Sequence, residues 1–181
     1  MRVSPPSWKK TATMGDARQA FRELTDLDGE NSRPIFLYFT STDEKMAGKV
    51  EAYENAVLTN EKVCIAAKFF DCYQIDVTDL DESHPMRNLV KKPKPLTVYT
   101  IHKGKILYKT KEKPSASLIF STCSRTLSKA FKVSLEKIAK EEEEMLDELD
   151  KILQEKQAID KKRLDKGRRL TSREDAALTK R

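Results

Sequence analysis

The chain has 181 residues, of which 38% are hydrophobic and 35% charged, and its formal net charge is +6. This length allows one domain of ordinary size with an appendage, and the low apolar content indicates that part of the chain is not packed in that domain. The sequence has no apolar run long enough to span a membrane, no signal-peptide pattern at its start, and no zinc-ligand spacing among its three cysteines and two histidines.

The first part of the chain predicts an arm and a helix. Residues 1–14 are polar and are expected to form a flexible arm, which Trp8 anchors on the domain. From Asp16, a suitable helix cap, apolar residues recur on one helical face over residues 17–27.

The most informative stretch is a strand followed by a polar turn and a helix. Residues 35–39 form a nearly continuous apolar run, which is typical of a strand that is buried on both faces. A polar turn at 40–43 and a helix at 44–58 follow. The amide groups at the start of such a helix can lower the pKa of a thiol, but residues 40–50 contain no cysteine.

The remaining elements of the domain alternate in the same way. The patterns predict, in order, a helix at 60–70, a strand at 72–77, a charged connection at 78–95, strands at 96–101 and 105–109 joined at Gly104, and a helix at 115–131. Cys123 lies on the apolar stripe of the last helix and is expected in the core.

Together these features resemble the thioredoxin-like superfamily over residues 8–132. The specific matches are Trp8 and the strand at 35–39, and the sequence PLTVYTIHKGKILYK at 95–109. The resemblance implies an α/β fold, a thioredoxin-like three-layer sandwich with a central mixed sheet. It also implies a cis proline at Pro95, facing the active-site turn. A redox member needs Cys-x-x-Cys after the first strand, and this chain lacks it. The candidates for a vestigial redox turn and peptide groove are Thr42, Asp43, Glu44, Met46 and Pro95.

After this domain, assigned to 15–132, residues 133–181 predict a long charged helix of coiled-coil type with a basic, frayed tail. Its apolar residues follow a seven-residue pattern and are the candidates for association: Leu135, Ile138, Met145, Leu149, Ile152 and Ile159. Gaps at Glu142 and Lys156 favour docking on a partner, or a short antiparallel pairing, over a long parallel dimer. A basic tip follows, formed by Lys161, Lys162, Arg163, Lys166, Arg168 and Arg169.

The function expected from these features is that of a redox-inactive thioredoxin-like protein, which acts as a protein-binding or assembly module through its C-terminal helix. We expect no catalytic residue, metal or cofactor, and a protein partner or self-association. One alternative is an atypical thiol-disulfide oxidoreductase that uses Cys64, Cys72 or Cys123, and another is a nucleic-acid- or ribosome-associated factor that uses the basic tip. The expected location is the cytoplasm, or outside the cell if the chain is a processed form.

Overall fold

The computed structural model describes residues 3–10, 33–80, 82–84 and 86–178, and for residues 10, 162, 163 and 165–178 it describes the backbone alone. The predicted helix at 17–27 lies outside the described residues. The chain divides into two compact units, Met1–Ala139 and Lys140–Arg181.

The first unit is built on a five-stranded mixed sheet with the order β1-β3-β2-β4-β5. Its strands are β1 (Lys9–Lys10), β2 (Ile35–Thr40), β3 (Asp71–Asp76), β4 (Thr97–His102) and β5 (Lys105–Lys109). β3 is parallel to both β1 and β2, whereas β4 is antiparallel to β2 and to β5. The mixed sheet expected from the resemblance is therefore confirmed.

β2 lies at the centre of the sheet because its apolar run is buried on both faces. Phe36, Leu37, Tyr38 and Phe39 are all 0% exposed. Alternate residues serve the two faces, so that Phe36 and Tyr38 belong to one core cluster while Leu37 and Phe39 belong to the other. The prediction of a strand buried on both faces is confirmed.

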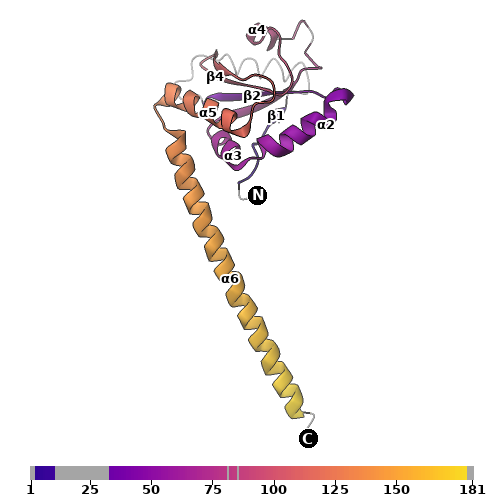
Figure 1. Ribbon diagram of the computed structural model, residues 1–181, viewed down its shortest axis with the longest axis vertical. Coiled ribbons are helices and arrows are strands. Elements are labelled where there is room, and N and C mark those ends of the chain that lie inside the picture. The colour runs from indigo at the N-terminus through magenta and orange to yellow at the C-terminus, as the bar shows by residue number, and fades with distance from the viewer. Residues whose placement is uncertain (1–2, 11–32, 81, 85, 179–181) are drawn as a thin grey trace. The chain divides into compact units, whose positions relative to one another are not determined.

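Helices cover these two faces. They are α2 (Glu44–Tyr53), the π-helix η1 (Glu54–Leu58), α3 (Glu61–Ala67), α4 (Met86–Leu89) and α5 (Ala116–Phe131). Residues of α2, η1, α3 and α5 pack in the cluster around Phe36, and α4 contributes Met86 to the cluster around Leu37. Figure 1 shows α2 and α3 on one side of the sheet and α4 on the other. The domain thus has three layers.

Short polar residues start three of these helices. The side chains of Asp43, Asn60 and Ser115 accept hydrogen bonds from the backbone amides of Lys45, Lys62 and Leu118 respectively. These caps satisfy amides that have no partner inside the helix, and they fix where each helix begins. The starts expected at Asn60 and Ser115 are confirmed.

The N-terminal strand β1 was not predicted from the sequence. Lys9 and Lys10, which fall in the predicted arm, pair with Tyr73 and Gln74 of β3. The ring of Trp8 lies 5.6 Å from that of Phe36 and 5.8 Å from that of Tyr38, between centroids. This aromatic contact holds the adjoining strand at the edge of the sheet.

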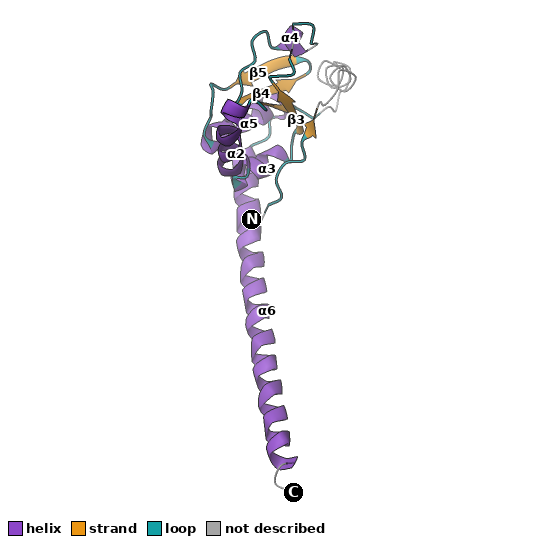
Figure 2. Cartoon of the chain, turned by 90° about the vertical axis from the view of Figure 1, so that its right-hand side faces the viewer, coloured by secondary structure: helices purple, strands orange, loops and turns teal. Residues whose placement is uncertain are grey.

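The C-terminal helix α6 (Leu135–Leu178) begins inside the first unit. Leu135 is 0% exposed and Ala139 is 4% exposed, and Leu135 belongs to the core cluster around Phe36. The rest of the helix is one uninterrupted element (Figure 2). Among the described residues, none of the helices combines the length and apolar character that a membrane crossing requires.

Candidate functional site

A pocket opens where β2 and β3 end, beside the first helix that follows β2. Its volume is about 560 Å³, and it is lined by Thr40, Ser41, Thr42, Ala47, Val50, Glu51, Glu54, Asn55, Gln74, Asp76 and Asp79. The lining contains four carboxylates and no lysine, arginine, histidine or cysteine. The pocket is therefore a negatively charged site in a chain that carries a net positive charge.

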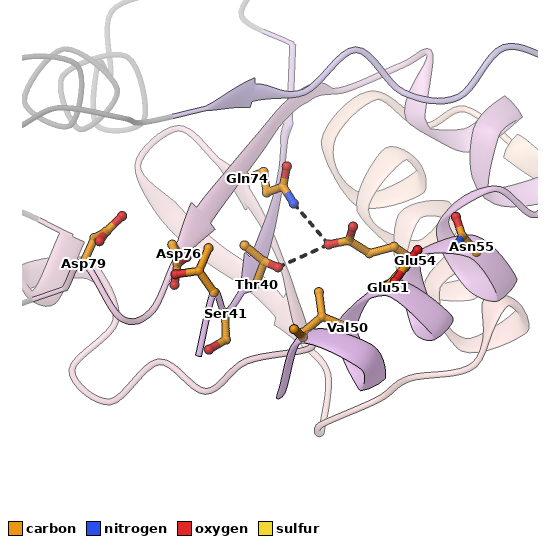
Figure 3. A pocket seen from close by; sticks show the side chains of 11 residues that line it. Thr40, Ser41, Val50, Glu51, Glu54, Asn55, Gln74, Asp76 and Asp79 are labelled. Carbon is orange, nitrogen blue, oxygen red and sulfur yellow. Dashed lines mark hydrogen bonds between the residues drawn. The ribbon is translucent and has the colours of Figure 1, made fainter. Parts of the chain in front are cut away.

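Glu54 is fixed at the inner wall of this pocket by two neighbouring strands. Its Oε1 atom accepts hydrogen bonds from Thr40 Oγ1 of β2 at 3.2 Å and from Gln74 Nε2 of β3 at 3.1 Å. Figure 3 shows both donors reaching the same carboxylate. Glu54 is also the first residue of the π-helix η1, an irregularity that often occurs at functional positions.

Asp76, the last residue of β3, is held at the same edge. Its Oδ1 atom accepts from the backbone amide of Thr78 at 2.8 Å and from Thr78 Oγ1 at 2.6 Å. Partial burial would raise the pKa of Asp76, but hydrogen bonds with Thr78 and Thr42 outweigh that effect and lower it. Its Oδ2 atom is buried and has no hydrogen-bond partner in the described part of the chain.

Two tyrosines near Glu54 stay neutral at physiological pH. Tyr38 and Tyr53 stack at 19° between their planes with centroids 6.3 Å apart. Burial raises the pKa of both phenols, and the nearby Glu54 carboxylate raises that of Tyr38 further. The Tyr53 hydroxyl donates to the carbonyl oxygen of Pro114 at 2.9 Å. Neither phenol is poised to act as a base.

The oxygen-rich lining of this pocket is suited to binding. Carboxylate, amide and hydroxyl oxygens suit a cationic or hydrogen-bond-donating group, and the lining offers no thiol to attack a disulfide. Over the described residues, no group of three or more His, Cys, Asp or Glu side chains is placed to hold a metal ion. The pocket was not predicted from the sequence because its carboxylates come from two separate segments, 51–54 and 76–79, of a chain that is rich in acidic residues.

Of the residues predicted for a vestigial redox turn, only Thr42 lines this pocket. Its Oγ1 atom lies 3.0 Å from Thr78 Oγ1. Asp43 caps α2, Glu44 is the exposed first residue of that helix, and Met46 packs partly against the core. The sequence pattern placed Thr42 correctly at this edge of the sheet. It did not identify the residues of β3 that lie beside it.

The expectation of a cis peptide bond at Pro95 is wrong. Across the described residues there is no cis peptide bond. The next residue, Leu96, is 1% exposed and has a left-handed backbone with φ 57°. Its amide donates to the carbonyl oxygen of Phe39 at 2.7 Å, and its own carbonyl accepts from the amide of Lys113 at 2.8 Å. The two hydrogen bonds hold this unfavourable conformation and bring the start of β4 to the end of β2.

The three cysteines are separate buried thiols. Cys64, Cys72 and Cys123 form no disulfide. Burial raises the pKa of all three and brings that of Cys72 to about 12. Cys123 is 0% exposed, which confirms its expected place in the core. Such thiols are protonated at neutral pH and therefore unreactive.

The residues predicted for association divide into two groups along α6. Leu135 is buried in the domain and Ile138 is half-buried, so these two belong to the first unit. By contrast, four are exposed: Met145 at 63%, Leu149 at 50%, Ile152 at 55% and Ile159 at 51%. Leu153, which was not predicted, is exposed at 46%.

The predicted basic tip is described in part only. Lys161 is exposed, whereas the side chains of Lys162, Arg163, Lys166, Arg168 and Arg169 lie outside the described part of the structure.

Similarity to known proteins is found among solved structures. No family model matches the chain, and no curated protein matches it. Among solved structures it is similar to the thioredoxin NaTrxh from Nicotiana alata, with 14% identity over 70% of this chain and 95% of that chain and a TM-score of 0.42. It is also similar to Trxlp from Edwardsiella tarda EIB202, with 10% identity over 62% and 94% and a TM-score of 0.40, and to a DsbH oxidoreductase, with 15% identity over 73% and 88% and a TM-score of 0.41.

The fold class follows from the sheet itself. A mixed sheet of order β1-β3-β2-β4-β5, with helices on both faces, is a thioredoxin-like fold. At the turn after β2, where a redox member carries its cysteine pair, this chain has Thr42, Asp43 and Glu44 and no cysteine.

Proposed function

We propose that this protein is a redox-inactive thioredoxin-like module that binds other protein chains through α6. The domain supplies a stable base on which the first turn of the helix is packed. The more distal part of the helix, from Met145 to Ile159, supplies the contact surface.

The observation that carries this proposal is the exposure of large apolar side chains at helical spacing. Met145, Leu149, Ile152, Leu153 and Ile159 are between 46% and 63% exposed. Single exposed apolar residues are ordinary, but five within four turns of one helix form the kind of stripe that a partner helix covers. A stripe of this type indicates an interface.

The state of the thiols supports a role without redox chemistry. Thiol exchange needs an accessible thiolate, and all three cysteines are buried with raised pKa values. We therefore expect the protein to reduce insulin disulfides no faster than the dithiothreitol background. A rate well above that background would favour the oxidoreductase alternative.

We propose the edge around Thr42 as a second, smaller contact surface. The pocket at this edge presents carboxylates to solvent, and Asp43, Glu44, Met46 and Pro95 belong to the segments that flank it. A basic segment of a partner chain would complement its charge.

Affinity capture with the full chain tests the main proposal. The test variant Leu149→Asp/Ile152→Asp places two charges in the stripe. The matched control Gln154→Asp/Gln157→Asp places the same two charges at exposed helix positions outside it. We expect proteins that co-purify with the wild type, or additional copies of the chain, to be retained by the control and lost by the test variant.

An unchanged set of co-purifying chains in the test variant would reject α6 as the binding element. If Thr42→Arg then abolished the same interactions, the edge around Thr42 would take its place.

A further inference from the structure

The distribution of charge along α6 identifies the kind of chain that can cover its stripe. Residues 141–150 contain seven acidic residues and no basic one, whereas residues 156–169 contain seven basic residues and two acidic ones. A second helix with the same sequence complements both halves only when it runs in the opposite direction.

We propose that the occupant of the stripe is a second copy of this chain, bound antiparallel with the two-fold axis near residue 154. This inference rests on the proposed function, because it takes α6 as the associating element and names its partner. The paired region, 141–169, would extend about 43 Å at 1.5 Å per residue, or about four heptads.

The heptad positions define the register. With Leu149 at position a and Ile152 at position d, Ile159 is also at d. In antiparallel helices a position a faces a position d of the partner, so an axis near residue 154 places Leu149 opposite Ile159 of the second copy. The same register places Glu142, a gap in the apolar heptad pattern, opposite Lys166. Glu142, which interrupts the stripe, is thereby matched with an opposite charge, whereas Lys156 lies opposite Ile152 and Arg163 opposite Met145.

The flanking g positions agree with this register. In antiparallel pairs the g positions of the two helices lie along the same side of the seam. Here Glu148 faces Lys162 and Glu141 faces Arg169, so that each pair occurs twice by symmetry. Among the g positions, Glu155 alone meets its own copy, near the axis. On the other side of the seam, Leu153 meets Leu153 of the second copy and adds apolar contact at the centre.

A parallel pair in register would have the opposite effect. It would place Glu142 against Glu142, Lys156 against Lys156 and Arg163 against Arg163 along the seam. Each pair of like charges would be partly desolvated without compensation, which is destabilising. Charge complementarity thus selects the antiparallel orientation.

Charge reversal on the full chain tests the orientation, with mass measured by light scattering over a concentration series. We expect the wild type to form a dimer of 20.8 kDa chains. Glu141→Lys/Glu148→Lys alone and Lys162→Glu/Arg169→Glu alone should each dissociate at least tenfold more readily. Mixing the two variants should restore the dimer, because each reversed segment then meets its complement.

Disulfide trapping provides an independent readout. In the antiparallel register Met145 lies opposite Arg163 of the second copy, so a mixture of Met145→Cys and Arg163→Cys chains should form crosslinked pairs. Met145→Cys alone should not, since its two copies would be about 27 Å apart along the axis. The native chain, whose thiols are buried, is the blank.

Three results would overturn the inference: a monomeric wild type, a failure of the mixed reversal variants to pair, or crosslinking of Met145→Cys alone, which indicates a parallel dimer. A monomer that still captures a different protein in a Leu149-dependent manner would overturn the antiparallel dimer and leave the proposed function intact. A dimer that tolerates Leu149→Asp/Ile152→Asp would overturn both.

Discussion

At the scale of single residues, the thiols show how position decides reactivity. Cys72 and Cys123 lie in the same core cluster between the sheet and its helices, and the Cys64 thiol donates to the carbonyl oxygen of Leu58 at 3.5 Å. Burial disfavours the thiolate in each case.

We predict that none of the three thiols reacts with Ellman's reagent in the native state at pH 8. All three should react on unfolding in guanidinium chloride. Glu44→Cys is the positive control, because it places one thiol at the exposed start of α2, where the helix amides lower its pKa. Rapid reaction of more than one thiol in this variant would show that a native cysteine is accessible.

His102 predicts a dependence of stability on pH. Partial burial and the neighbouring Lys103 charge lower the pKa of His102, and its ring lies 5.1 Å from that of Phe131 between centroids. The unfolded chain therefore takes up this proton at a higher pH than the folded chain. The corresponding stability is present above about pH 6.5 and is lost as the pH falls through the folded-state value.

Urea unfolding of the wild type and His102→Gln between about pH 7.5 and about pH 5 measures this effect. We expect the wild type to lose more stability than the variant over that range. An equal loss in both proteins would show that other groups carry the pH dependence.

At the scale of elements, α6 belongs to two environments. Leu135 is fully buried, while Met145 on the same helix is 63% exposed. The first turn therefore contributes to the core of the domain, and the later turns do not.

Replacing Leu135 by alanine should lower the free energy of unfolding of the domain by about 2–5 kcal/mol, since it leaves a cavity in the core. Leu164→Ala, the matched control at a 65% exposed position of the same helix outside the stripe, should change it by less than about 0.5 kcal/mol. Chemical denaturation of both variants, followed by the fluorescence of Trp8, compares them. Equal effects would mean that the start of α6 is not part of the cooperative domain.

Elements with a strong local pattern could be predicted from the sequence, and those fixed by pairing could not. β2 was predicted because residues 35–39 are buried on both faces and form a continuous apolar and aromatic run. β1 consists of Lys9 and Lys10, which carry no strand signal, and it exists because β3 pairs with it and Trp8 packs beside it. The π-helix at Glu54 was predicted as ordinary helix because its different hydrogen bonding leaves little trace in periodicity.

The candidate site was harder to predict than the fold. Thr42 was identified because it directly follows an obvious strand. Glu54, Gln74 and Asp76 come from two other elements and meet Thr42 only after the sheet has formed. In a chain with 29 acidic residues, no spacing distinguished these carboxylates.

At the scale of the whole molecule, charge segregation along α6 predicts that assembly depends on ionic strength. Salt screens the exposed contacts between the acidic and basic halves but leaves apolar burial intact. We expect the dissociation constant of the dimer to rise by roughly tenfold between about 0.05 M and about 0.5 M NaCl. Sedimentation equilibrium measures this dissociation constant. An affinity that rose with salt would indicate that like charges meet in the dimer.

The placement of Leu135 and Ala139 in the core has a consequence for how such a protein can change over time. The packing of the domain core constrains which amino acids can occupy these two positions. Residues 145–159 are constrained only by the surface that covers the stripe. Substitutions in the later turns can therefore exchange one binding partner for another at no cost to folding. In a lineage of such chains, the sequence of the first turn of α6 would stay constant while the sequence of its later turns diverged.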